Sequence, residues 1–182
     1  MAFGKLIDIL KIQNRSAEDL DLIEKSYNFA AKIHQNQKRK SGDPYITHPL
    51  STATRLAEMH LDAKTVAAAL LHDTCEDGDC TKEEIKNLFG KEISFLVEGV
   101  TKLDRIRYKG SGRSAESLRK MFLAIGEDIR IVLLKLVDRL HNMETLQYLP
   151  PEKQKRIARE TLEIYAPLAY RLGMSKLSSQ LE

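Results

Sequence analysis

The stretch EDLDLIEKSYNFAAKIHQN, residues 18–36, indicates the fold class of this chain. Its apolar residues recur every three or four positions, which brings them to one face of an α-helix. They include Leu20, Ile23, Tyr27 and Ala30. Ser16 lies three residues before Asp19, and this spacing is typical of a residue that caps the start of a helix. The pattern therefore predicts a helix over these residues.

The same helical period continues through most of the chain. We expect further helices at about 48–60, 63–74, 81–88, 92–106, 113–125, 128–147, 151–168 and 171–182. Asp62, Thr81 and Asp128 stand where three of them begin, and these residue types suit a helix N-cap. No stretch alternates convincingly as a strand. The sequence predicts an all-α fold, with residues 1–182 forming a single helical bundle of about nine to ten helices, a size expected for one domain.

Residues 37–47, QKRKSGDPYIT, interrupt the helical pattern. Gly42 and Pro44 break regular structure, and Asp43 precedes a proline, where the helical conformation is disfavoured. We expect an ordered loop here. The stretch KGSGR at residues 109–113 is the best candidate for a flexible loop.

Composition excludes several classes of protein. The chain has 182 residues, of which 42% are hydrophobic and 30% charged, as in an ordinary globular domain. No apolar run approaches the ~20 residues that span a membrane. The formal net charge of +3 gives no reason to expect a nucleic-acid partner. The two cysteines, Cys75 and Cys80, cannot form a disulfide framework, which fits a reducing cytoplasm.

Two histidines and two aspartates form the strongest chemical feature of the sequence. His72 and Asp73 end the apolar run VAAALLHD, while His48 opens one predicted helix and Asp138 lies within another. Two imidazoles and two carboxylates suit a divalent ion such as Mn²⁺, Fe²⁺, Co²⁺ or Zn²⁺. An ion held in this way keeps positions open for water and a phosphate oxygen, as in metal-assisted hydrolysis. The spacing alone leaves open a capping aspartate beside a buried histidine.

An acidic pair follows closely. Glu76 is four residues after His72, so the two share a face if the helix continues that far. A carboxylate of Glu76 or Asp77 beside a bound water could take its proton and later return one to a leaving oxygen. A solvated acidic helix end is the alternative.

Polar residues in two other places suit a nucleotide. Arg39, Lys40 and Ser41 lie in the loop before His48, where the cations can neutralise phosphate and the guanidinium can stack on a base. Asn142 lies four residues after Asp138 on the same helical face, with Thr145 nearby, and both could hold a sugar or base. Solvated surface is the alternative in both places.

Five stretches taken together resemble the HD metal-dependent phosphohydrolase superfamily. More narrowly, they resemble the N-terminal hydrolase domain of long Rel/SpoT-type alarmone enzymes, over about residues 20–182. They are RKSGDPYITHP at 39–49, LLHDTCED at 70–77, VTKLDRI at 100–106, DIRIVLLKLVDRLHNMETL at 128–146 and ETLEIYAPLAYRLGMSKL at 160–177.

The resemblance implies a helical domain that binds Mn²⁺ and removes the 3′-pyrophosphate from ppGpp and pppGpp, giving GDP or GTP and pyrophosphate. The metal ligands that it implies are His48, His72, Asp73 and Asp138. The matching catalytic acids are Glu76 and Asp77, and the nucleotide contacts are Arg39, which packs on guanine, Lys40, Ser41, Asn142 and Thr145. Inactive relatives in the family have lost the HD and ED residues. Here the pairs His72-Asp73 and Glu76-Asp77 are both present, so the sequence predicts an active hydrolase.

The sequence departs from the family at Thr74-Cys75, where two Val-like residues are common, and at Gly78. In the long enzymes a ppGpp synthetase domain follows in the same chain, and a parent of that type can also be a GTP pyrophosphokinase. The helical pattern continues to Glu182, so we expect a fragment of such a protein. Two alternatives stay open: a catalytically silent alarmone-sensing module, and another HD-superfamily nucleotide phosphohydrolase.

Overall fold

The computed structural model describes residues 2–75, 80–104, 123 and 126–182, and the regular structure among them is helical apart from one isolated bridge between Lys38 and Pro44. This confirms the all-α prediction. The helix expected at 113–125 and the loop expected at 109–113 lie outside the described residues, apart from Leu123. The chain divides into two compact units, Met1–Lys102 and Leu103–Glu182.

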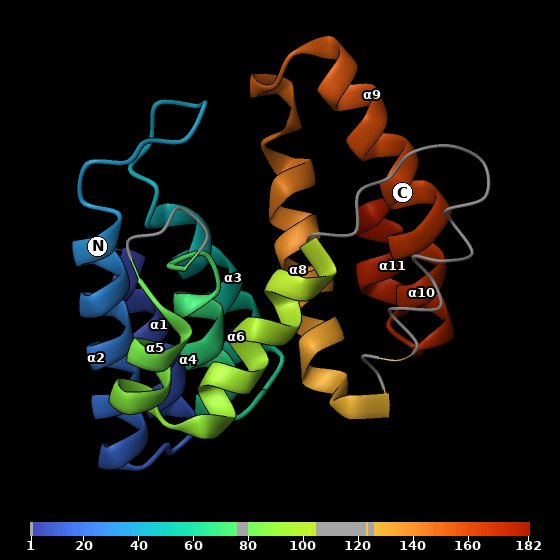
Figure 1. Cartoon of the computed structure of the whole chain (residues 1–182). Coiled ribbons are helices and arrows are strands. Elements are labelled where there is room, and N and C mark those ends of the chain that lie inside the picture. Colours follow the sequence, from blue (N-terminus) through green and yellow to red (C-terminus); the bar gives the residue numbers. More distant parts are fainter. Residues whose placement is uncertain (1, 76–79, 105–122, 124–125) are drawn as a thin grey trace. The chain divides into compact units, whose positions relative to one another are not determined.

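In the first unit, helix α4 is central (Figure 1). It packs against α2 and α3, and α3 packs against α1. Every residue of α4 except Lys64 is buried, because its alanines and leucines face neighbours on all sides. The helices that run through this unit are α1 (Ala2–Ile12), α2 (Ala17–Ile33), α3 (Thr47–Glu58), α4 (Ala63–Leu71), α5 (Lys82–Phe89) and α6 (Lys91–Asp104).

Side-chain caps begin these helices where the sequence predicts them. The Ser16 hydroxyl accepts a hydrogen bond from the Asp19 amide at 3.1 Å, and the Asp62 carboxylate accepts one from the Thr65 amide at 3.0 Å. Thr81 begins α5 with a complete capping box. Each cap satisfies an amide that the helix itself leaves without a partner.

Helix α1 is not among the helices expected from the sequence. Leu6 and Leu10 are fully buried, and Phe3 stacks on Tyr27 of α2 with ring centroids 4.0 Å apart. A helix of this length gains most of its stability from such tertiary packing rather than from local propensity.

The second unit holds a series of shorter helices around α8. The elements are α8 (Ile129–Glu144), the 3₁₀ turn η1 (Leu146–Tyr148), α9 (Pro151–Glu160), the π-helical turn η2 (Thr161–Tyr165), α10 (Ala166–Arg171) and α11 (Ser175–Leu181). Helix α11 packs against α10, α8 and η2. The break between α10 and α11 lies at Gly173, where a φ of +77° favours glycine. The helical pattern of the sequence predicted this break at residues 169–170.

Helix α8 is held by charged groups at its start and in its middle. The Asp128 side chain accepts a hydrogen bond from the Arg130 amide at 2.9 Å and pairs with the Arg130 guanidinium at 2.7 Å. Arg139 is buried, pairs with Glu160 at 3.1 Å, and lies 4.1 Å from the centroid of the Tyr165 ring. Tyr165 is the last residue of η2, so this π-helical turn contacts α8 through Arg139.

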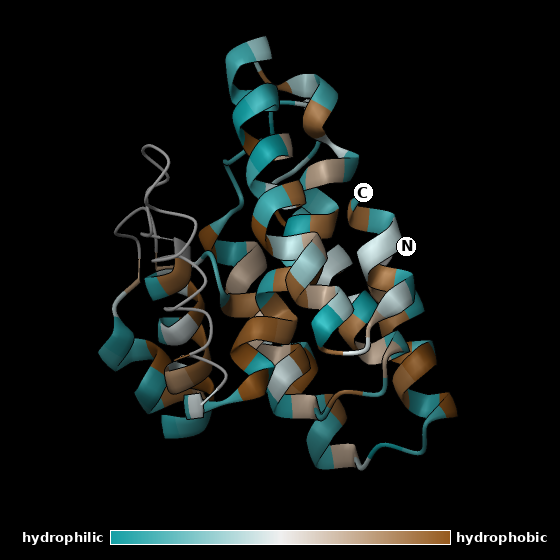
Figure 2. Ribbon diagram, turned by 90° about the vertical axis from the view of Figure 1, so that its right-hand side faces the viewer, coloured by the Kyte–Doolittle hydropathy of each residue, from teal (hydrophilic) through white to brown (hydrophobic). Residues whose placement is uncertain are grey.

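Figure 2 shows brown hydrophobic and teal hydrophilic residues sharing most of the helices, as expected of amphipathic helices that bury one side. Within the part of the chain that the structure describes, no helix combines the length and the apolar character needed to cross a membrane.

Candidate metal centre

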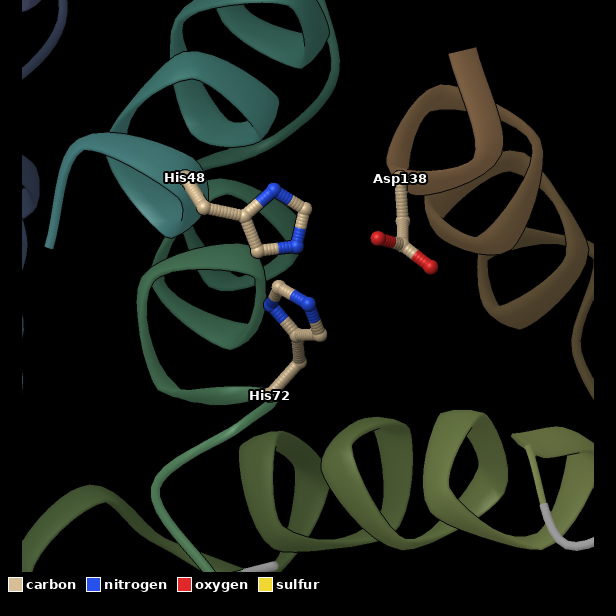
Figure 3. A group of neighbouring side chains, drawn as sticks. All are labelled: His48, His72 and Asp138. Carbon is tan, nitrogen blue, oxygen red and sulfur yellow. The ribbon is translucent and has the colours of Figure 1, made fainter. Parts of the chain in front are cut away.

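Two histidines face each other in the first unit. His48 lies in the first turn of α3, and His72 lies directly after the last residue of α4. Their ring centroids are 5.4 Å apart, and both residues are buried. Figure 3 shows the two imidazoles turned toward one another from these two helices. The packing of α3 on α4 therefore brings together two side chains that are 24 positions apart in the sequence.

A backbone carbonyl sets the orientation of the His72 ring. The Nδ1 atom of His72 lies 2.8 Å from the carbonyl oxygen of Ala69. A carbonyl oxygen only accepts hydrogen bonds, so Nδ1 must carry the proton. In the neutral ring, Nε2 then presents a lone pair, which is the form of histidine that binds a metal ion.

The Asp73 carboxylate lies against both rings. Its Oδ1 is 3.0 Å from His72 Nε2, and its Oδ2 is 3.5 Å from His48 Nε2. Neighbouring residues on a continuous helix would point about 100° apart. Helix α4 ends at Leu71, and His72 and Asp73 lie on the turn that follows, closed by a hydrogen bond from the Thr74 amide to the Leu71 carbonyl at 3.1 Å.

This donor set fits a divalent cation. A lone pair on His72 Nε2 facing a carboxylate oxygen is repulsive unless a proton or a metal ion lies between them. Two imidazole nitrogens and carboxylate oxygens are ligands that transition ions share. Three of the four ligands that the sequence suggests, His48, His72 and Asp73, therefore lie together within one unit.

Tyr45 is a site residue that the sequence reasoning missed. Its hydroxyl donates a hydrogen bond to Asp73 Oδ2 at 3.0 Å, and its ring packs on His34 with centroids 4.7 Å apart. Tyr45 also precedes His48 by three residues, and its carbonyl accepts a hydrogen bond from the His48 amide at 3.0 Å. The position of Tyr45 in RKSGDPYITHP was the available signal.

In the second unit, Asp138 lies buried on α8 (Figure 3). Its Oδ1 accepts a hydrogen bond from the Asn142 amide nitrogen at 2.8 Å, which agrees with the shared helical face predicted for these two residues. Its Oδ2 accepts one from Lys135 Nζ at 2.6 Å, and both side chains of this ion pair are 4% exposed. Lys135 was not singled out from the sequence, although a lysine within the apolar run IVLLKLVD was a usable signal.

The predicted nucleotide loop is an ordered turn in the first unit. The Arg39 amide donates to the Asp43 carbonyl, and the Gly42 amide donates to the Arg39 carbonyl, both at 2.9 Å. The Ser41 hydroxyl donates to the Asp43 carboxylate at 2.7 Å. Lys40 is exposed and Arg39 half-buried, so this turn presents cationic side chains at the surface.

Two predicted groups remain. Thr145 ends α8, and its hydroxyl donates to the His141 carbonyl at 3.1 Å. Glu76 and Asp77 lie outside the residues that the structure describes. Their catalytic role therefore stays a prediction from the sequence.

Comparison with known proteins identifies relatives of most of the chain. A protein-family model described as "HD domain" matches residues 26–175. A protein of Aquifex aeolicus named guanosine-3′,5′-bis(diphosphate) 3′-pyrophosphohydrolase is 51% identical over 175 residues, which are 96% of this chain and 25% of that protein. The bifunctional (p)ppGpp synthase/hydrolase SpoT of Escherichia coli is 50% identical over 173 residues, 94% of this chain and 25% of its own length.

A solved structure extends the comparison to the fold. It belongs to a metazoan protein described as an orthologue of SpoT that hydrolyses ppGpp, and it covers 91% of this chain and 92% of its own. Its TM-score is 0.69 at 25% sequence identity. The chain spans about a quarter of the length of the two curated relatives described above.

Proposed function

We propose that this chain, which belongs to the HD domain family, is a metal-dependent hydrolase that converts ppGpp and pppGpp into GDP or GTP and pyrophosphate. The observation that carries the proposal is the packing of the Asp73 carboxylate against His48 Nε2 and His72 Nε2 in the first unit. The names of relatives about half identical in sequence supply the substrate.

The metal ligands in this proposal are His48, His72, Asp73 and Asp138. His48, His72 and Asp138 each offer one atom of a kind that binds divalent ions. We favour Mn²⁺, with other divalent transition ions as alternatives, because nitrogen and carboxylate donors together accept several of them. The chemistry that such an ion supplies when bound is Lewis acidity, which polarises a phosphate and makes water easier to deprotonate.

The residues of the chain then move the protons. Glu76 or Asp77 accepts a proton from the attacking water, whose oxygen forms a bond to the phosphorus attached to the ribose 3′ oxygen. The bond from that phosphorus to the 3′ oxygen breaks, and the 3′ oxygen receives a proton. Pyrophosphate leaves with the oxygen of the water, and a 3′ hydroxyl stays on the nucleoside.

The nucleotide contacts in this proposal are those that the sequence suggests. Arg39 stacks on guanine, while Lys40 and Ser41 contact the nucleotide from the same turn. Asn142 and Thr145 line the remainder of the pocket. Asn142 already orients the Asp138 carboxylate, so one side chain serves both the ligand and the nucleotide.

The setting of the activity is also a proposal. Relatives of this chain are named as GTP pyrophosphokinases and as bifunctional synthase/hydrolases, and the chain matches only a fraction of their length. We therefore propose that a synthetase domain belongs to the same protein. We also propose a cytoplasmic location, because two cysteines cannot form a disulfide framework. Nothing in its composition suggests a nucleic-acid or membrane partner.

Product analysis tests the proposal. Metal-stripped protein is incubated with ppGpp, with and without Mn²⁺, and the products are separated. We expect pyrophosphate and GDP only when Mn²⁺ is present. Orthophosphate as the product would instead favour another nucleotide phosphohydrolase of this family. Binding of ppGpp without turnover would favour a silent sensing module, and the absence of both would reject the alarmone assignment.

A further inference from the structure

Two cysteine sulfurs lie close together beside the candidate metal centre. The Sγ atoms of Cys75 and Cys80 are 3.2 Å apart, and both residues are free cysteines. Cys75 is two residues beyond Asp73, and Cys80 directly precedes Thr81, the cap of α5. The pair therefore stands at the two ends of the stretch 76–79, which contains both predicted catalytic acids.

Each cysteine is attached to a well-defined helix end. The Thr74 hydroxyl donates to the Leu71 carbonyl at 2.7 Å, which ties the residue before Cys75 to the end of α4. The Thr81 capping box fixes the residue after Cys80 at the start of α5. The Cys80 sulfur also lies 3.4 Å from the Thr81 carbonyl oxygen. The approach of the two sulfurs thus follows from the placement of α4 and α5.

We propose that Cys75 and Cys80 form a reversible intramolecular disulfide when the protein meets a peroxide, and that this disulfide slows the hydrolase. The second half of this proposal rests on the proposed function. The sulfurs need to approach by little more than 1 Å to reach the ~2.05 Å of a disulfide bond. A disulfide of this kind in a reducing compartment is transient and redox-sensing rather than structural.

The chemistry balances with hydrogen peroxide as oxidant. The Cys75 sulfur attacks one peroxide oxygen, the O–O bond breaks, and Cys75 sulfenic acid and water form. The Cys80 sulfur then attacks the Cys75 sulfur, the S–S bond forms, and the S–O bond breaks. The sulfenic hydroxyl takes up the Cys80 thiol proton and leaves as a second water. Two thiols lose two electrons, which reduce one peroxide to two waters, and a dithiol reductant reverses the change.

The surroundings of the two thiols set the order of these steps. Cys75 is half-buried, whereas Cys80 is 5% exposed. Burial, followed by the hydrogen bond with Cys75, raises the pKa of the Cys80 thiol to about 12. A protonated, buried thiol reacts slowly with an oxidant in solution. Cys75 therefore reacts with the peroxide first, and the Cys80 thiol then reacts with the Cys75 sulfenic acid to form the disulfide.

The disulfide would act on the turn that carries Asp73. Asp73 lies two residues before Cys75, and its carboxylate lies 3.0 Å from His72 Nε2 and 3.5 Å from His48 Nε2. Drawing the Cys75 sulfur toward Cys80 by about 1 Å strains this turn. A misplacement of a group in the site by about 1 Å can cost on the order of 100-fold in rate, so we expect ppGpp turnover to fall about 10–100-fold in the oxidised protein.

Peptide mapping tests the disulfide directly. Trypsin cuts after Lys64 and Lys82, so a single peptide, residues 65–82, contains both cysteines. The folded protein is treated with hydrogen peroxide, its remaining thiols are alkylated, and the digest is weighed by mass spectrometry. We expect this peptide to carry no alkyl group and to lack two hydrogen atoms, and dithiothreitol to restore both thiols.

Matched variants and an activity assay complete the experiment. In Cys80→Ala, peroxide should leave a Cys75 sulfenic acid that a dimedone probe traps, and no disulfide. In Cys75→Ser, the Cys80 thiol should stay reduced over the same period. Two alkylated cysteines in the treated wild-type peptide, or a disulfide seen only after unfolding in urea, would overturn the proposal. A fully formed disulfide with unchanged ppGpp turnover would overturn its effect on catalysis. A reduced protein without turnover would reject the proposed function, while the peptide result would still decide the disulfide.

Discussion

Asp73 and Asp138, the two aspartates proposed as metal ligands, have different surroundings in their respective units. Asp73 contacts two imidazole nitrogens and the Tyr45 hydroxyl. Asp138 contacts the ammonium group of Lys135 and the amide of Asn142. The positive charge of Lys135 therefore lies directly beside the buried Asp138 carboxylate.

The comparison indicates two ways of preparing an acidic ligand. A buried carboxylate without a nearby cation is costly, and an ion pair offsets that cost. Asp138 is stabilised by a lysine of its own helix. Asp73 accepts a hydrogen bond from the Tyr45 hydroxyl and faces the lone pair of His72 Nε2, so a metal ion contributes most to this part of the site.

Replacement of Asp73 should have the largest effect on turnover. Asp73→Asn keeps the shape of the side chain and an acceptor for Tyr45, but removes the anionic ligand. We expect at least a 100-fold loss of Mn²⁺-dependent ppGpp hydrolysis, since loss of a mere hydrogen-bond partner of a ligand costs about 10–100-fold. Circular dichroism should be unchanged. Asp8→Asn, on the exposed surface of α1, is the control. Wild-type turnover by Asp73→Asn would refute the ligand assignment.

Removal of the lysine beside Asp138 should have the largest effect on stability. Lys135→Met removes the ammonium group that lies 2.6 Å from the buried Asp138 carboxylate, and breaking a buried ion pair costs about 3–5 kcal/mol. Urea unfolding of the metal-free protein measures the loss. Lys155→Met is the matched control, because Lys155 pairs with Glu152 at 3.9 Å where both side chains are largely exposed, and such a pair contributes less than about 1 kcal/mol. Equal losses in the two variants would remove the distinction between Asp73 and Asp138.

Tyr45→Phe tests the neutral support of Asp73. The change removes only the hydroxyl that donates to the carboxylate. We expect Mn²⁺ to bind about 10–100-fold more weakly, as when a hydrogen-bond partner of a metal ligand is lost. Calorimetric titration measures this affinity without relying on activity. Tyr170→Phe, on an exposed tyrosine of α10, should bind as the wild type does. If Tyr45→Phe binds Mn²⁺ as tightly as the wild type, the Tyr45 hydroxyl does not help to orient Asp73 for metal binding.

The cap of α8 should give the smallest effect, and one that depends on pH. Hydrogen bonds from the Arg130 side chain, followed by the Arg130 amide, lower the pKa of Asp128 below its ordinary value of 3.8. The charged form is therefore stabilised in the folded state. This contribution is present above the ordinary pKa and is lost as the pH falls through the lowered one.

Asp128→Ala should accordingly cost about 1 kcal/mol at neutral pH, the usual worth of an N-cap. The difference from wild type should shrink in acid, once Asp128 of the wild type is protonated. Urea unfolding at about pH 7 and about pH 2.5 measures both values. A difference that is the same at both pH values would mean that the charge of Asp128 contributes nothing to the stability of α8.

The sequence predicted those parts of the fold that depend on local chemistry. Caps at Ser16, Asp62, Thr81 and Asp128 are decided by side chains within three residues of one another, and the structure has each of them. Helix α1 was missed, because its burial depends on packing against α2 and α3.

The same division holds for the candidate site. The sequence indicated His72 and Asp73 because they end an apolar helix, and Asn142 because it lies one turn from Asp138. It did not indicate Tyr45, since the direction of that side chain depends on the path of the loop at 37–47. Lys135 could have been recognised from a single charge in an apolar run.

The most direct test of the central claim is the number of Mn²⁺ ions that the chain binds, and the residues on which that binding depends. Calorimetric titration of metal-stripped wild type, Asp73→Asn and Asp138→Asn provides both. The proposal predicts one Mn²⁺ per chain in the wild type, and binding at least about 10-fold weaker in each variant, since both carboxylates hold the same ion. Asp138→Asn protein that binds Mn²⁺ as tightly as the wild type would contradict a shared site.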